Sequence, residues 1–164
     1  MGISSTTSGL GVHYTRDCGD VIANQTGYLE RVLKRYCMDK CKYAASQMPQ
    51  KFEIDADKLP ERGTDQDIEE MRSILGSLQY LQLWSRPEIS FSVNYLAQYT
   101  LRTDKSTIAA ARRILRYLAG TKEKGIRFQY NTSTQLSRNA VKVYAYTSDA
   151  DCQTTSKSTG CYII

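Results

Sequence analysis

The N-terminal part of the sequence changes from a pattern typical of strands to one typical of a helix. Two short runs rich in β-branched and aromatic residues, GLGVHYT and DVIANQT, lie on either side of the turn-like sequence RDCG. Such runs, joined by a short loop with a glycine, predict a β-hairpin. The next stretch, YLERVLKRYCM, has apolar residues at helical spacing and Thr26 as a candidate cap. Its apolar face consists of Leu29, Val32, Leu33 and Tyr36.

A long polar connector precedes the next predicted helix. Residues 39–66 have no sustained period, so we expect a connecting segment that is partly mobile. The helix that follows runs from about Ile68 to Trp84, until the sequence SRPE interrupts its pattern. Its apolar side consists of Ile68, Met71, Leu75, Leu78 and Leu81. This periodicity predicts an amphipathic helix packed against a core.

Two more helices are predicted directly after this one. Pro87, behind Ser85 as a candidate cap, opens a helix that continues to about Leu101. Asp104 is placed to cap the last helix, KSTIAAARRILRYLAGTK, and Gly120 to end it. The sequence therefore predicts a bundle of three or four helices after the hairpin.

The C-terminal residues return to a strand pattern. GIRFQY and VKVYAY are strand candidates separated by a polar loop. The order of elements predicts an α+β chain with an N-terminal β-hairpin, a helical bundle and C-terminal strands. We expect three regions: residues 1–26 with the hairpin, residues 27–124 with the helices, and residues 125–164 with the last strands.

The composition of the chain indicates where in the cell the protein is expected, but says little about its function. Of 164 residues, 41% are hydrophobic and 24% charged, as in ordinary globular domains. No apolar run approaches the roughly 18 residues of a membrane span, and the first ten residues lack a secretory pattern. Five cysteines, an odd number, favour reduced thiols. We therefore expect an intracellular protein, cytoplasmic or nuclear, with no membrane partner.

Basic residues gather on the last predicted helix. Its apolar side, Ile108, Ala111, Ile114, Leu115 and Leu118, is separate from a basic arc of Lys105, Arg112, Arg113 and Arg116. Such an arc is either a solvated face or a site for phosphate groups. On the helix before Trp84, Gly76 would let a sugar–phosphate backbone approach, and Tyr80 could pack against a sugar or base edge.

Two carboxylates follow the last strand candidate. The sequence YTSDADCQTTSKSTGCYII places Asp149 and Asp151 just after VKVYAY. Carboxylates at this position often hold a catalytic metal ion. No further acidic residue follows Asp151 in the sequence, so this pair alone does not complete such a site.

Several long blocks of the sequence resemble copia-type retrotransposon polyproteins. These blocks are YLERVLKRYCM, RSILGSLQYLQLWSRPEISFSVNYLAQY, AAARRILRYLAGTKEKGIRF and YTSDADCQTTSKSTGCY, in the same order as in that family. The resemblance covers most of the chain from Leu10 onward. It implies a stretch of reverse transcriptase, from the end of the palm through the thumb, that runs into the start of ribonuclease H.

The resemblance assigns roles to particular residues. The hairpin corresponds to the primer grip, and the helices correspond to the thumb, which follows the minor groove of the template–primer duplex. Gly76 and Tyr80 match the glycine and aromatic positions that track this groove in retroviral relatives, and Arg72 lies one turn earlier. Asp149 matches the first catalytic carboxylate of ribonuclease H, and the last strands correspond to an incomplete ribonuclease H-like sheet.

The resemblance also implies that this chain is non-catalytic by itself. Ribonuclease H holds two Mg²⁺ ions with several carboxylates, and here only Asp149, helped by Asp151, is present. The polymerase motif Tyr-x-Asp-Asp does not occur in the sequence, and Cys152 stands where the family has an aromatic residue. Mg²⁺ therefore belongs to the parent enzyme, and we expect no firm binding here.

Two functional interpretations remain open at this stage. The first is a fragment of a reverse transcriptase and ribonuclease H whose parent activity is RNA-directed DNA synthesis. The second is a retained module that binds nucleic acid, or is merely structural, without chemistry. The expected partner is template–primer duplex, an RNA–DNA hybrid or DNA. Self-association through the truncated C-terminus is also expected, because an incomplete sheet leaves unpaired edges.

Overall fold

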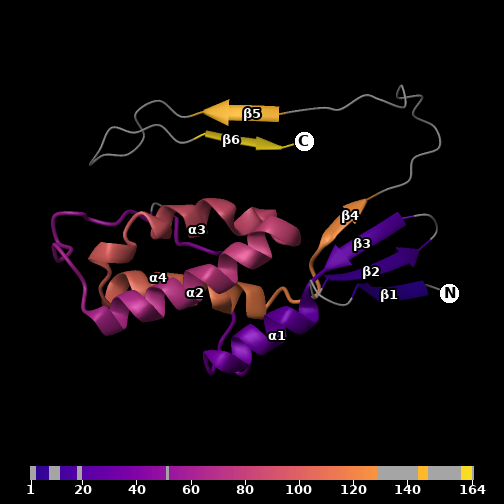
Figure 1. Ribbon diagram of the computed structural model, residues 1–164, viewed down its shortest axis with the longest axis horizontal. Helices are drawn as coiled ribbons and strands as arrows, with labels where there is room; N and C mark the ends of the chain where they lie inside the picture. The colour runs from indigo at the N-terminus through magenta and orange to yellow at the C-terminus, as the bar shows by residue number, and fades with distance from the viewer. Residues whose placement is uncertain are drawn as a thin grey trace. The chain divides into compact units, whose positions relative to one another are not determined.

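The chain has mixed α and β structure, as the sequence predicts, and it divides into two compact units (Figure 1). The computed structural model describes residues 3–7, 12–17, 20–50, 52–128, 144–147 and 160–163. The first unit, Met1–Tyr130, contains a sheet and the helices, and the second, Asn131–Ile164, contains a pair of strands.

The sheet of the first unit is antiparallel, and its strand order is β1-β2-β3-β4. The strands are β1 (Ile3–Thr7), β2 (Val12–Asp17), β3 (Asp20–Asn24) and β4 (Ile126–Phe128). β2 and β3 pair from Asp17 opposite Asp20, which confirms the predicted hairpin. β4 joins β3 from far along the chain. Gly125 permits this approach, because a Cβ atom there would clash with the carbonyl oxygen of Ala23.

Four α-helices lie between β3 and β4 in the part of the chain that the structure describes. They are α1 (Thr26–Arg35), α2 (Asp65–Trp84), α3 (Ser90–Ala97) and α4 (Lys105–Ala119). Two 3₁₀ helices, η1 (Pro87–Ile89) and η2 (Thr100–Arg102), flank α3. The single helix predicted from Pro87 to Leu101 is therefore interrupted. The Thr100 hydroxyl group donates to the Ala97 carbonyl oxygen and satisfies the end of α3.

Of the three predicted N-terminal caps, one is confirmed and two are wrong. Asp104 caps α4 as predicted, and Gly120 ends that helix. Thr26 does not cap α1: it is the first helical residue, and its hydroxyl group donates to the Lys122 carbonyl oxygen. Ser85 does not cap the next helix either, because it ends α2 and donates to Gln25. Both side chains have distant partners that compete with the local cap.

The helices share one hydrophobic core. The predicted apolar sides of α1, α2 and α4 are buried, except for Tyr36, which follows α1 and is half-buried; Leu33, Leu78 and Leu118 are fully inaccessible to solvent. Each such side chain contributes about 1.5–3 kcal/mol when it leaves water. Residues of α3 complete the core, and the connector adds Met38 and Ala44. The core therefore fixes the directions in which the polar faces of α1, α2 and α4 point.

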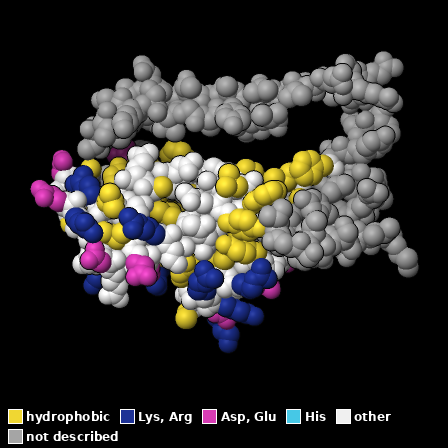
Figure 2. Space-filling model, viewed as in Figure 1, with side chains coloured by type: hydrophobic (Ala, Val, Ile, Leu, Met, Phe, Trp, Pro, Cys, Tyr) yellow, Lys and Arg dark blue, Asp and Glu magenta, His cyan; other side chains and the backbone are white. Residues whose placement is uncertain are grey.

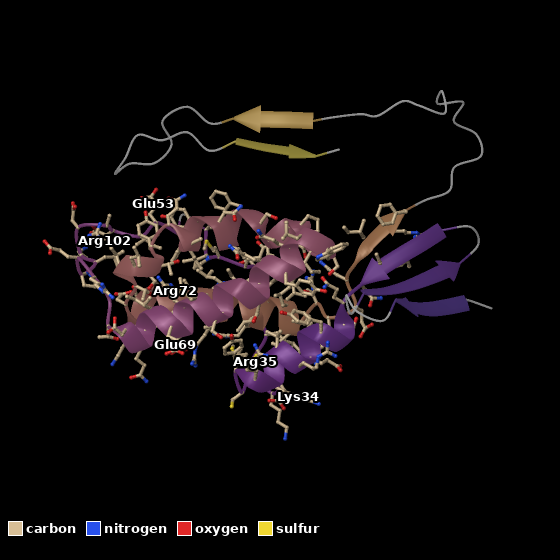
Figure 3. All side chains as sticks on the ribbon, in the orientation of Figure 1. Lys34, Arg35, Glu53, Glu69, Arg72 and Arg102 are labelled. Atoms are coloured by element: carbon tan, nitrogen blue, oxygen red, sulfur yellow. The ribbon has the colours of Figure 1, made fainter. Side chains whose placement is uncertain are left out.

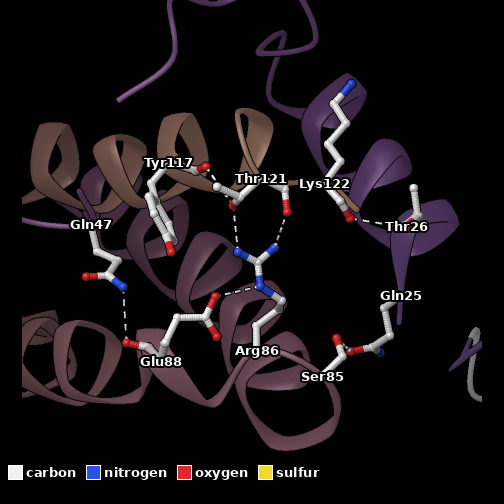
Figure 4. A network of polar contacts seen from close by, with 9 residues as sticks. All are labelled: Gln25, Thr26, Gln47, Ser85, Arg86, Glu88, Tyr117, Thr121 and Lys122. Atoms are coloured by element: carbon white, nitrogen blue, oxygen red, sulfur yellow. Dashed lines mark hydrogen bonds and ion pairs between the residues drawn. The ribbon is translucent and has the colours of Figure 1, made fainter. Parts of the chain in front are cut away.

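A buried arginine joins the end of α2 to the end of α4 (Figure 4). Arg86 is 1% exposed, and its Nε atom donates to the Glu88 carboxylate at 2.7 Å. Its two terminal nitrogens donate to the carbonyl oxygen and the hydroxyl group of Thr121, at 3.0 and 2.6 Å. The guanidinium group also lies 5.8 Å from the ring centroid of Tyr117. Because its charge is paired and hydrogen-bonded, this burial is tolerated.

The connector between α1 and α2 contains no helix or strand among its described residues, and polar contacts attach it to the helices. Arg102 donates to the carbonyl oxygens of Ala56, Leu59 and Pro60. The backbone N–H of Ile54 donates to the Tyr95 hydroxyl oxygen at 3.0 Å. That this connector is partly mobile stays a prediction.

The second unit contains β5 (Tyr144–Thr147) and β6 (Gly160–Ile163), which pair in antiparallel fashion. β5 falls at the end of the predicted strand VKVYAY. Asp149, Asp151 and Cys152 lie outside the described residues. Across the described part of the chain, no helix has the length and apolar character to cross a membrane.

Candidate nucleic-acid interface

The residues predicted to approach a nucleic-acid backbone lie along one face of α2. Arg72, Gly76 and Tyr80 are spaced by four residues, so each is about one turn from the next. Arg72 (labelled in Figure 3) and Gly76 are exposed, and Tyr80 is half-buried. A Cβ atom added at Gly76 would meet no other atom within 4 Å. The structure thus brings the three residues together on a face with open space above its centre.

The end of this face is apolar. Leu83 lies about one turn after Tyr80 and is 75% exposed, and the next residue, Trp84, is 41% exposed. Figure 2 shows hydrophobic side chains next to groups of Lys and Arg on this side of the helices. An arginine at one end and apolar side chains at the other suit a surface that contacts both phosphates and sugar edges.

Helix α1 supports the face from one side. The rings of Tyr28 and Tyr80 meet edge to face, with centroids 4.7 Å apart and planes at 64°. Directly after the end of α1, the Tyr36 hydroxyl group lies 2.7 Å from the Ser73 hydroxyl oxygen. Aromatic pairs of this geometry contribute about 0.5–1.5 kcal/mol beyond burial. Tyr80 is therefore held in a defined orientation beside Gly76.

The predicted basic arc of α4 is engaged with other parts of the chain. Arg112 donates through two nitrogens to the Glu70 carboxylate of α2, at 2.6 and 3.0 Å. Both side chains are partly exposed, so this pair is worth at most about 1 kcal/mol and can exchange partners. Glu70 and Gly76 lie about 120° apart around α2, which places Arg112 beside a different face of the helix.

The other two arginines of the arc contact the connector. Arg116 donates to the Lys42 carbonyl oxygen at 2.7 Å, and Arg113 donates to the Ser46 hydroxyl oxygen at 3.3 Å. A basic periodicity on α4 alone does not reveal these contacts, because the partners lie more than sixty positions earlier in the chain. Of the six residues predicted to bind nucleic acid, the structure groups Arg72, Gly76 and Tyr80, and it separates them from the α4 arginines.

Two further arginines near the α2 face were not singled out from the sequence. Arg31 and Arg35 lie one turn apart on α1, and both are exposed. The Arg31 guanidinium group lies 5.9 Å from the ring centroid of Tyr28, the residue that contacts Tyr80. Their spacing is visible in the sequence YLERVLKR, but only the packing of α1 on α2 relates them to Gly76.

A metal site is not apparent in the described part of the chain. Among these residues, no three His, Cys, Asp or Glu side chains come close enough together to hold a metal ion. The predicted metal-binding and catalytic residue, Asp149, lies outside them. Its role and that of Mg²⁺ stay predictions.

Comparison with known proteins points to transposon polyproteins. The chain is 30% identical to an uncharacterized mitochondrial protein of Arabidopsis thaliana, over 94% of this chain and 63% of that protein. It is 44% identical to the retrovirus-related Pol polyprotein from transposon RE1 of Arabidopsis thaliana, over 52% of this chain and 5% of the polyprotein. The retrovirus-related Pol polyprotein from transposon TNT 1-94 of Nicotiana tabacum is 26% identical, over 74% of this chain and 9% of its own length.

These matches are to parts of longer proteins. The chain spans 63% of the mitochondrial relative and 5% of the RE1 polyprotein. No family model and no solved structure matches the chain. The agreement of several relatives nevertheless confirms the resemblance drawn from the sequence blocks: the chain is similar to segments of retrovirus-related Pol polyproteins of copia-type transposons and to a mitochondrial protein.

Proposed function

We propose that this chain is a fragment of the reverse transcriptase and ribonuclease H region of a copia-type Pol polyprotein. In this proposal the hairpin of β2 and β3 corresponds to the primer grip, and the helices form a thumb. The thumb binds template–primer duplex along the face of α2, without base-specific contacts. The parent activity is RNA-directed DNA synthesis, and this chain contributes binding rather than chemistry.

The observation that carries the proposal is the open surface over Gly76. A glycine inside a helix costs about 1 kcal/mol relative to alanine, and α2 continues for eight residues beyond it. No neighbouring atom would contact a Cβ atom at this position, so packing within the chain gives no reason for the glycine. Close approach of a nucleic-acid backbone would explain the glycine. Arg72 and Tyr80 lie one turn before and one turn after it.

The absence of chemistry in the proposal rests on the sequence. Polymerases of this family hold their metal ions with a Tyr-x-Asp-Asp motif, which this sequence lacks. Two Mg²⁺ ions need several oxygen ligands in a fixed geometry, and the ribonuclease H-like segment offers Asp149 and Asp151. Mg²⁺ is thus assigned to the parent enzyme.

A second candidate function is a structural module with no ligand. The contacts of Arg112, Arg113 and Arg116 favour it for α4, because these arginines stabilise the fold by binding Glu70 and the connector. The same explanation does not extend to Gly76, because a Cβ atom at this position would contact no neighbouring part of the chain. The two candidates therefore differ in what a side chain at position 76 does.

The test is a fluorescence-anisotropy titration of the full chain with a labelled duplex at several salt concentrations. Weak, sequence-independent binding is expected, and three phosphate contacts on B-DNA would give a log–log salt slope of roughly −2.7. Gly76→Val should weaken binding about tenfold, or ~1.4 kcal/mol, while the thermal midpoint stays equal or rises. Gln66→Val places the same side chain near the start of α2 and should leave binding unchanged.

Two results would overturn the proposal. One is the absence of duplex binding at low salt. The other is a Gly76→Val variant that binds like the parent chain, since the open surface then serves no backbone. In either case the structural module becomes the better explanation.

A further inference from the structure

Helix α1 runs beside the stretch of α2 that carries Gly76. Two contacts define this arrangement: Tyr28 with Tyr80, at 4.7 Å between ring centroids, and Tyr36 with Ser73, at 2.7 Å between hydroxyl oxygens. Gly76 lies between Ser73 and Tyr80 in α2. Whatever approaches Gly76 must therefore also pass close to the outer flank of α1.

That flank is basic. On a helix of about 100° per residue, Arg35 and Arg31 project about 20° and 60° from the direction of Tyr28, whereas Lys34 projects about 120° away. Figure 3 labels Arg35 and Lys34 on this helix. Lys34 instead lines a small pocket with Lys122 and Asp39. Arg31 and Arg35 are thus the cations of α1 that lie nearest the α2 face.

We infer that Arg31 and Arg35 bind phosphate groups of the duplex that lies over Gly76, as a second row of contacts beside Arg72. The inference rests on the proposed function and extends its site to α1. The two arginines are about 6 Å apart along the helix axis, and both are exposed. A guanidinium group offers two parallel N–H donors, which match the oxygens of a phosphate group. The Arg31 guanidinium group lies over the Tyr28 ring, the residue that contacts Tyr80.

The competing explanation is helix stability. Cations in the last turn of a helix interact favourably with its dipole, by about 0.3–1 kcal/mol, and the last turn of α1 contains Lys34 and Arg35. This effect depends on position along the helix and not on direction around it. Lys34 and Arg35 should therefore stabilise α1 equally, whereas only Arg35 faces the proposed duplex.

The experiment compares two double variants of the full chain that remove equal charge. R31Q/R35Q should reduce the magnitude of the salt slope on B-DNA by about 1.8, for two lost phosphate contacts. K34Q/K122Q removes two charges from the small pocket that Lys34 and Lys122 line, away from Tyr28, and should leave the slope close to that of the parent chain. R31K/R35K keeps the charge and should largely restore the slope. Thermal unfolding of each variant verifies that it is folded.

The outcomes separate this inference from the proposed function. If the parent chain binds duplex and Gly76→Val weakens binding, but R31Q/R35Q and K34Q/K122Q give the same slope, the inference is wrong and the proposed function stands. Equal losses of thermal stability in the two double variants would then assign Lys34 and Arg35, the cations in the last turn of α1, to the helix dipole. If the parent chain binds no duplex, both fail.

Discussion

At the scale of single residues, the N-terminal cap of α4 affects the pKa of its own carboxyl group, Asp104. The Asp104 carboxylate accepts from the Thr107 backbone N–H, and the Thr107 hydroxyl oxygen accepts from the Asp104 N–H, each at 2.9 Å. Burial raises the pKa of Asp104, but hydrogen bonds from Thr107 and Ser106 outweigh it and hold the pKa below its ordinary value of 3.8. The folded chain therefore favours the carboxylate form.

This shift gives a pH-dependent contribution to stability with a defined sign. Because the pKa is lower in the folded state, the contribution is complete above about pH 4 and is lost as pH falls through the folded pKa. Asp104→Ala should cost about 0.5–2 kcal/mol at pH 7. Asp104→Asn should keep most of the cap and remove its acid sensitivity. Urea unfolding at pH 7 and pH 3 checks this; an Asn variant that loses as much stability as the parent chain on acidification would contradict it.

The same residues show what a local pattern can predict. The Asp-x-x-Thr cap of α4 was predictable because donor and acceptor lie three positions apart. Thr26 and Ser85 have equally suitable side chains, yet they bind Lys122 and Gln25, at separations of 96 and 60 positions. Arg31 and Arg35 were missed for the same reason, since a contact between helices gives them their place.

At the scale of elements, α4 and the connector depend on each other. Besides the contacts of Arg113 and Arg116, the Ala44 N–H donates to the Arg116 carbonyl oxygen at 3.3 Å. Periodicity predicted the apolar side of α4 correctly, because a face of period 3.6 must meet a core. It could not predict which cations on the other side have partners, since those partners belong to a segment without any period.

Removing these contacts should release the connector. The double variant Arg113→Ala/Arg116→Ala should be cleaved by chymotrypsin several-fold faster than the parent chain after Tyr43, which is 58% exposed, because local opening becomes easier. Arg112→Ala removes the same kind of side chain but only an exposed pair with Glu70, so it should be cleaved at the parent rate. Equal cleavage of all three chains would show that the connector is held by its apolar contacts alone.

At the scale of the whole molecule, the similarity to transposon proteins and the expected activity rest on different observations. The similarity rests on relatives that match most or half of this chain. The mixed α and β fold agrees with the order of elements that the sequence predicts. β1 had no such signal: its sequence, ISSTT, does not alternate apolar and polar residues, and only pairing with β2 makes it a strand. β4 was predictable as a strand, but its pairing with β3 was not, because it depends on the packing of the helices that lie between the two strands in the chain.

Catalysis by this chain is expected to be absent. With Mg²⁺ or Mn²⁺, the purified protein should neither extend a primer on an RNA template nor cleave the RNA strand of a hybrid, because the carboxylates around Asp149 are too few for two metal ions. Primer extension and hybrid cleavage assays check this directly. Turnover above background that disappears in an Asp149→Asn variant would show that the site is complete after all.

The buried Arg86 has a consequence for the order in which the chain becomes stable during synthesis. Its main partner, Thr121, is made 35 positions later, after α3 and α4. Until Thr121 has left the ribosome, the two terminal nitrogens of Arg86 lack the acceptors that they have in the folded chain, and burial of a guanidinium group with incomplete partners is strongly unfavourable. We therefore expect a nascent chain that ends in α3 to keep the end of α2 hydrated, and the helical core to close only after the residues that follow α4 have been made.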